Sequence, residues 1–216
     1  RPMTFTVDSV EYTQERAIAT QQTGFTLVAQ MRNWLPDAVG GVLWFGVDDT
    51  NTCVYIPIYC SATEVPECFN PKNGSLYKLS WTSAFWIHNW VANMAYARYN
   101  YMIKDIRPVQ QQLENEFNTW QPSIEKAAID LYKNDKDAAI RFLTAYSVAQ
   151  AQRSTARWKE LGEYLMVKYL DGNIKREKDG QFMDNGYGLP ESPEFPGYSE
   201  EYYRAVAKDA GERLKV

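Results

Sequence analysis

Residues 40–59 of the chain read GGVLWFGVDDTNTCVYIPIY, and they contain two apolar runs separated by a polar turn. Val42 to Val47 is a continuous apolar run of strand length, which predicts a strand that is buried on both faces. The residues from Asp48 to Asn51 predict a hairpin turn, and Cys53 to Tyr59 predicts the next strand. Pro57 favours an edge position or a bulge for this second strand, because proline has no N–H to donate to a neighbouring strand.

The sequence before this stretch also predicts β-structure. Residues 5–7 form a short alternating run, and residues 16–32 are rich in β-branched residues, with a break near Gly24. A further turn at residues 71–74 marks the point after which the spacing of apolar residues changes. These patterns predict an α+β fold whose strands lie in the first third of the chain.

The sequence after that turn predicts mainly helices. Apolar residues recur at helical spacing after a cap at Thr82 or Ser83. Pro108 is expected to kink or end the first helix near Arg107, because a proline inside a helix removes one backbone hydrogen bond. Pro122 suits the first turn of a second helix, where its missing N–H costs nothing.

Three segments follow from these patterns. Residues 1–79 are β-rich, residues 80–170 form a helical layer, and residues 171–216 form an irregular tail with a short terminal helix. The 216 residues suit one large domain, so we expect all three segments to belong to it.

Charge and hydropathy limit the classes of partner. The formal net charge is -4 and the sequence pI is about 5.2, which argues against nucleic acid and anionic membranes as partners. No apolar run approaches the roughly 20 residues that span a bilayer. The chain opens on Arg1-Pro2 without an initiator Met, so we expect a fragment or a processed product.

The residues alone do not supply a complete active site. His88 is the one imidazole, so a Ser-His-Asp or Cys-His site would depend on it, and a metal site with several histidines is excluded. The packed position of His88 beside Trp86 and Trp90 favours a structural role. Cys60 and Cys68 either form a disulfide in an oxidising compartment or, like Cys53, are free thiols. From residues alone the prediction is a soluble α+β domain without a self-sufficient catalytic centre.

Several short stretches in order resemble the dipeptidase A and secernin family of N-terminal-nucleophile cysteine peptidases. The stretches are RAIATQQT at 16–23, VAQMR at 28–32, GGVLWFG at 40–46, VYIPIY at 54–59, EVP at 64–66 and SAFW at 83–86. The family's first stretch usually reads Thr-x-Glu-Ser, and Gln22 and Thr23 stand in its place here. This departure removes a carboxylate, although Gln22 keeps the ability to form hydrogen bonds.

The resemblance implies a fold, a reaction and a missing part. The full enzyme would have a four-layer αββα fold with two stacked antiparallel sheets, to which this chain, as the C-terminal half, adds strands and a helical layer. The nucleophile would be a cysteine at the N-terminus of a preceding segment, with its own α-amino group as base, so no histidine, metal or organic cofactor is implied. No cysteine of this chain matches that motif, so the isolated chain is expected to be inactive.

The remaining expectations concern partners and the cleft. The resemblance implies short peptides as substrates and the N-terminal half of the same protein as a partner, and a homo-oligomer is left open. Candidate substrate-binding residues are Gln22, Arg32, Ser83 and Trp86, which lie on strands or at the start of the long helix. Localisation is not fixed, with an exported (periplasmic or extracellular) protein favoured. The alternative function is a non-catalytic binding module that uses the aromatic helix after Ser83 for docking.

Overall fold

The structure is a computed structural model that describes residues 3–15 and 17–216. Arg16, the first residue of the first motif above, therefore lies outside the described residues. The chain divides into two compact units, one that reaches to Gly162 and one that runs from Glu163 to Val216.

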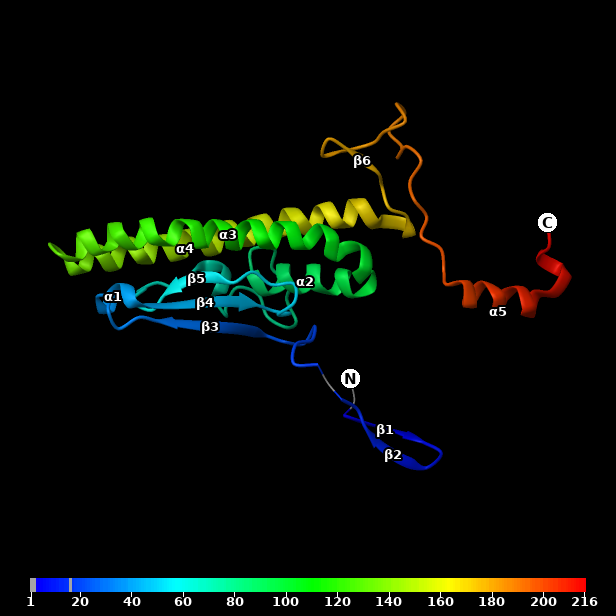
Figure 1. Ribbon diagram of the computed structural model, residues 1–216, viewed down its shortest axis with the longest axis horizontal. Helices are drawn as coiled ribbons and strands as arrows, with labels where there is room; N and C mark the ends of the chain where they lie inside the picture. The colour runs from blue at the N-terminus through cyan, green and yellow to red at the C-terminus, as the bar shows by residue number, and fades with distance from the viewer. Residues whose placement is uncertain (1–2, 16) are drawn as a thin grey trace. The chain divides into compact units, whose positions relative to one another are not determined.

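A three-stranded antiparallel sheet is the centre of the first unit (Figure 1). Its strands are β3 (Phe25–Met31), β4 (Gly41–Val47) and β5 (Ile56–Tyr59), in the order β3-β4-β5, and a single helical turn, α1 (Asp37–Gly40), links β3 to β4. Pro57 pairs with Trp44 from an edge strand, which confirms the edge position predicted from the proline. The strand β5 begins three residues later than predicted, at Ile56.

A separate two-stranded hairpin precedes the sheet. Strands β1 (Thr4–Val7) and β2 (Val10–Thr13) pair antiparallel. The two residues that join them, Asp8 and Ser9, have φ angles of 49° and 64°, which is the left-handed conformation of the tight hairpin turns that match strand twist.

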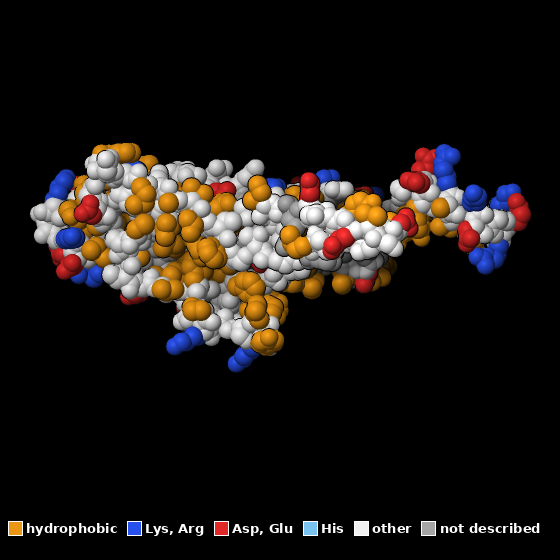
Figure 2. Space-filling model, turned by 90° about the horizontal axis from the view of Figure 1, so that it is seen from below, with side chains coloured by type: hydrophobic (Ala, Val, Ile, Leu, Met, Phe, Trp, Pro, Cys, Tyr) orange, Lys and Arg blue, Asp and Glu red, His pale blue; other side chains and the backbone are white. Residues whose placement is uncertain are grey.

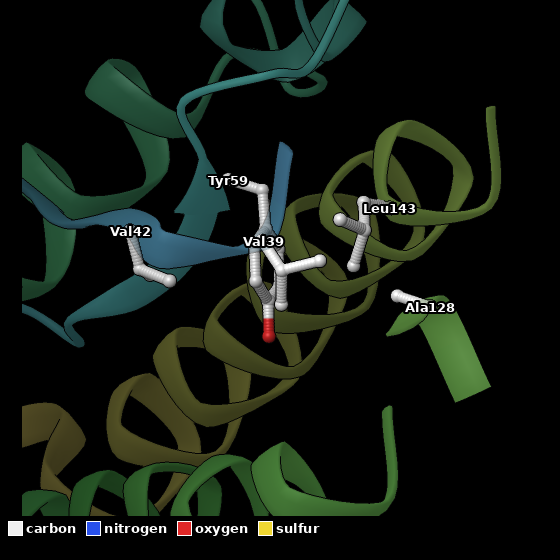
Figure 3. Close-up of a cluster of buried hydrophobic side chains, with 5 residues drawn as sticks. All are labelled: Val39, Val42, Tyr59, Ala128 and Leu143. Carbon is white, nitrogen blue, oxygen red and sulfur yellow. The ribbon is translucent and has the colours of Figure 1, made fainter. Parts of the chain in front are cut away.

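Three helices pack with the sheet. They are α2 (Ala84–Ala97), α3 (Tyr99–Tyr132) and α4 (Lys136–Tyr169). A cluster of buried side chains joins α3 and α4 to the sheet, and Figure 3 shows Tyr59 and Val42 of the sheet with Leu143 of α4 and Ala128 of α3. Arg153 of α4 also forms an ion pair of 2.6 Å with Glu116 of α3. Burial of this apolar face, rather than helix propensity alone, holds such long helices in place.

Pro108 does not end a helix and Pro122 does not begin one, because α3 runs through both prolines. The alternative, that Pro108 kinks the helix, stays a prediction. Each proline removes the hydrogen bond to the carbonyl four residues before it. Both prolines are exposed, as are Lys104 and Asn118, whose carbonyls lose their intrahelical donors. These carbonyls can therefore hydrogen-bond to water, and the helix continues.

A line of polar atoms without partners runs along the buried face of α4. The side chains of Tyr146, Gln150, Ser154 and Trp158 recur at four-residue intervals, so they lie on one face of the helix. Each has a buried polar atom that lacks a hydrogen-bond partner among the described residues. We call these four residues the polar seam of α4.

The second unit contains short elements. A two-stranded ribbon pairs β6 (Glu177–Lys178) with β7 (Gln181–Phe182), and α5 (Glu200–Ala210) is capped by Ser199, whose Oγ accepts from the Tyr202 amide at 3.2 Å. Single 3-10 turns lie at Leu170–Gly172 and Gly211–Leu214. Lys168 donates to Glu177 at 2.7 Å.

The fold class predicted from the sequence is confirmed: antiparallel strands occupy the first third of the chain and the rest is mainly helical. The three-segment domain boundaries stay a prediction. Among the described helices, none is both long enough and apolar enough to cross a membrane.

Candidate functional site

A cavity of about 380 Å³ opens at the end of the sheet where β3 begins and β4 ends. The two strands are tied together there by the Asp48 amide, which donates to the Gly24 carbonyl at 2.9 Å. The cavity is lined by the ends of both strands, by the segment after the 3-10 turn η1 (Glu67–Phe69) and by the start of α2. The volume lies within the roughly 300–1,000 Å³ of small-molecule sites.

Aromatic rings form one wall of this cavity. Phe45 of β4 stacks on Phe25 of β3 with 5.7 Å between ring centroids, and it meets Phe69 edge-to-face at 5.3 Å. The rings come from three elements that are distant in sequence. Phe25 and Phe45 meet because they lie on the same face of neighbouring strands. The result is an apolar surface that can accept an apolar group of a ligand.

Trp86 closes another side of the cavity. Its indole N–H donates to the Ser75 carbonyl at 3.1 Å, which fixes the ring against the loop. Gly74 lies beneath the ring with a φ of +88°, and a Cβ there would be 3.1 Å from the indole. A glycine is therefore required both by the backbone conformation and by the close approach.

Ser83, at the start of α2, brings a side-chain hydroxyl to the cavity wall. It is the N-cap residue of α2 and only 5% exposed, but among the described residues its hydroxyl makes no capping hydrogen bond. The first N–H groups of a helix have no partner within the helix. Ser83 therefore brings a hydroxyl and the start of a helix to a cavity whose other polar side chains are Asn70, Asn73 and Ser75.

Asp48 lies directly after β4, next to the cavity residue Val47, and is 1% exposed. Its Oδ1 accepts from Asn89 of α2 at 2.9 Å, while its Oδ2 has no partner among the described residues. Loss of hydration raises the pKa of this carboxyl to about 6, although the Asn89 hydrogen bond opposes the change. Its φ is 68°, a left-handed conformation that aspartate tolerates better than most residues.

The prediction of a hairpin turn after Val47 did not anticipate this burial. The neighbouring Asp49 is also buried, and it accepts hydrogen bonds from Thr52 at 3.1 Å and Tyr96 at 3.2 Å. The sequence signal for this burial is that two acidic residues directly follow a fully apolar strand. That signal was weaker than the turn propensity of Asp and Asn.

The structure brings two of the four predicted binding residues together, because Ser83 and Trp86 line the same cavity. Gln22 lines a separate hollow of about 220 Å³ with Thr20 and Tyr96. Arg32 follows the opposite end of β3, where it forms a 2.6 Å ion pair with Glu125 of α3. Substrate contact stays a prediction for all four residues.

The Arg32 guanidinium forms hydrogen bonds and an ion pair with other groups of the protein. Its guanidinium donates to both Glu125 oxygens and to the carbonyls of Val39 and Gly40. Glu125 also accepts from Tyr59 at 3.2 Å. Both charged side chains are nearly buried, at 11% and 12% exposure, so this cluster connects the sheet to α3.

The cysteines and the histidine are not arranged as nucleophile and base. Burial raises the pKa of Cys53 to about 12 and also raises the pKa of Cys68, so both thiols are protonated near neutral pH. The three cysteines are free in the structure, with Cys60 exposed, and a Cys60–Cys68 bridge stays a prediction. His88 stacks on Trp158 with 5.0 Å between centroids, and burial lowers its pKa to about 3.

Metal ligands do not gather in the part of the chain that the structure describes: no group of three or more His, Cys, Asp or Glu side chains could hold an ion.

Comparison with known proteins identifies the family. The sequence model of peptidase family C69 matches residues 2–112, which contain the sheet, the cavity and α2. A curated relative, a probable dipeptidase of Latilactobacillus sakei, is 29% identical over 133 residues, which are 62% of this chain and 26% of the relative. The chain thus spans about a quarter of the length of that relative. Because the family match covers just over half of the 216 residues, this chain belongs to peptidase family C69, a family of cysteine-type dipeptidases.

Proposed function

We propose that this chain is the C-terminal portion of a cysteine dipeptidase that hydrolyses short peptides through an acyl-enzyme, and that it supplies scaffold and one wall of the substrate cleft. The observation that carries the proposal is the family match over residues 2–112. The relative of Latilactobacillus sakei supports it, because this chain aligns with only part of that longer protein.

The surface of β3 supports a partner from the same polypeptide. No described strand pairs with the outer edge of β3, so its outward N–H and C=O groups are available to another strand. Four of its large apolar side chains are exposed, namely Phe25, Leu27, Val28 and Met31. Figure 2 shows hydrophobic side chains gathered over the sheet part of this surface. The missing portion would add its strands to this edge and cover those of the four side chains that do not line the cavity, namely Leu27, Val28 and Met31.

The nucleophile would lie in that missing portion. Cys53 and Cys68 are buried thiols with raised pKa values, which is the opposite of an activated cysteine. An N-terminal cysteine with its own amine as base would attack the peptide carbonyl, release the amine product, and form a thioester that water then hydrolyses. This reaction needs neither His88 nor a cofactor.

The test is expression of the complete reading frame from which this chain derives. We expect the processed full-length protein to hydrolyse dipeptides, replacement of its N-terminal cysteine by serine to reduce the rate at least 100-fold, and the 216-residue chain alone to be inactive. Hydrolysis by the chain alone, or full activity after loss of the N-terminal cysteine, would contradict the proposal. A reading frame that starts just before Arg1 would favour the binding module instead.

A further inference from the structure

We propose that the cavity at the start of α2 is a subsite for the carboxylate end of a peptide whose terminal side chain is apolar or aromatic. The carboxylate would bind at Ser83 and the first amides of α2, and the side chain would lie against Phe25, Phe45 and Phe69. This inference rests on the proposed dipeptidase function and names the class of substrate for the same cleft.

The part of the cavity wall at Ser83 suits an anion for two reasons. The first N–H groups of α2, a helix of 14 residues, have no intrahelical acceptors and carry the positive end of the helix dipole. Ser83 lines the cavity and is only 5% exposed, and its hydroxyl makes no capping hydrogen bond among the described residues. A hydroxyl in this position can donate to a carboxylate oxygen, as the amides can.

Most of the remaining lining suits an apolar group, and its other polar side chains, Asn70, Asn73 and Ser75, are uncharged. Among the described residues that line it, none carries a charge, so a lysine or glutamate side chain would lose its hydration without gaining an ion pair. The rings of Phe25, Phe45 and Phe69 offer stacking and edge contacts to a ligand ring. Leu76, which also lines the cavity, is 76% exposed and lies where a ligand side chain would cover it.

The experiment measures binding to the 216-residue chain by ¹H–¹⁵N NMR titration, with the Trp86 indole and the amides of Ala84 and Phe85 as reporters. The probes are N-acetyl-L-phenylalanine, its C-terminal amide, and N-acetylglycine. We expect the amide to bind about tenfold more weakly than the acid, since hydrogen bonds to charged groups are the stronger ones. We expect N-acetylglycine to bind at least tenfold more weakly than N-acetyl-L-phenylalanine, because it lacks the ring.

Two variants test the assignment of Ser83. Ser83→Ala should weaken N-acetyl-L-phenylalanine binding about tenfold, whereas Ser123→Ala, at an exposed serine on α3, should leave it unchanged. Ser83→Asp places a carboxylate at the N-cap, where it favours the helix, so the protein should remain folded while the anionic probe no longer binds. Thermal unfolding of Ser83→Asp at or above the wild-type midpoint checks that loss of binding is not loss of fold.

Equal affinity for acid and amide, equal affinity for the phenylalanine and glycine probes, or unchanged binding by Ser83→Asp would each overturn the inference. These outcomes concern binding to this chain and need no catalysis. Failure of the dipeptidase proposal appears instead as an inactive full-length protein, so the two failures are distinguishable.

Discussion

Replacing Asp48 with asparagine should stabilise the fold at neutral pH and leave its stability much less changed at pH 4. The carboxyl has a pKa of about 6 in the folded protein against 3.8 as its ordinary value, because it is removed from water. At pH values between 3.8 and about 6, the Asp48 carboxyl holds a proton in the folded state that it has released in the unfolded state. The contribution of Asp48 to the free energy of unfolding therefore falls as the pH rises through this window.

The magnitude follows from the size of the shift. About two pKa units at 1.36 kcal/mol per unit correspond to about 3 kcal/mol. Asparagine has no such titration, it also tolerates the left-handed φ of 68°, and its side-chain oxygen can keep the hydrogen bond from Asn89. Because part of the titration with the ordinary pKa of 3.8 lies below pH 4, the stability difference between Asp48→Asn and wild type should grow by about 2 kcal/mol from pH 4 to pH 7.

Urea unfolding at several pH values between 4 and 7.5 measures this difference. The titration of His88 is common to both proteins, so it cancels. Asp179→Asn is a matched control, because Asp179 also has a positive φ, of 53°, but is exposed, and its replacement should change stability little at any pH. A stability difference that does not vary with pH, or an Asp48→Asn protein that is less stable at pH 7, would refute the reasoning.

Three further substitutions probe the packing by urea unfolding. Arg32→Leu should lower the free energy of unfolding by about 3–5 kcal/mol, because it leaves Glu125 buried without its cation. The double variant with Arg32→Leu and Glu125→Leu should recover most of this loss. A single variant of near wild-type stability would show that the ion pair is not structural. The stability of His88→Phe relative to wild type should increase by about 2 kcal/mol as the pH falls from 8 to 5. The reason is that His88 has a pKa of about 3 in the folded protein against an ordinary 6.5, so the wild type loses stability over this range. Parallel stability curves for the two proteins would contradict this. Gly162→Ala should destabilise by about 1–3 kcal/mol, because its Cβ would be 2.4 Å from the Trp90 ring, and the stabilisation usual for alanine in a helix would be the opposing result.

The strands of the sheet were predictable because their signals are local. The apolar run of Val42 to Val47 has the length and composition of an inner strand, and the structure places β4 between two partners. Pro57 restricts its strand to an edge for a reason that needs no knowledge of the rest of the fold.

The features that sequence reasoning missed depend on distant residues. Whether Pro108 breaks a helix depends on which side of α3 faces water, and that is decided by packing. The buried Asp48 accepts its hydrogen bond from Asn89, which is 41 residues away. Arg32 resembled a free cation on a strand, but its partner Glu125 lies 93 residues later. Local patterns carry none of these pairings.

The polar seam of α4 affects the order in which parts of the protein unfold. A buried face whose polar atoms have no partner among the described residues gains less by leaving water than an apolar face of the same area, so α4 is held less tightly than its length suggests. Backbone amides from Tyr146 to Trp158 should exchange with deuterium sooner than those of β4. The sheet would then persist in a partially unfolded species from which α4 has already separated, while the Arg32–Glu125 ion pair still holds α3 to the sheet.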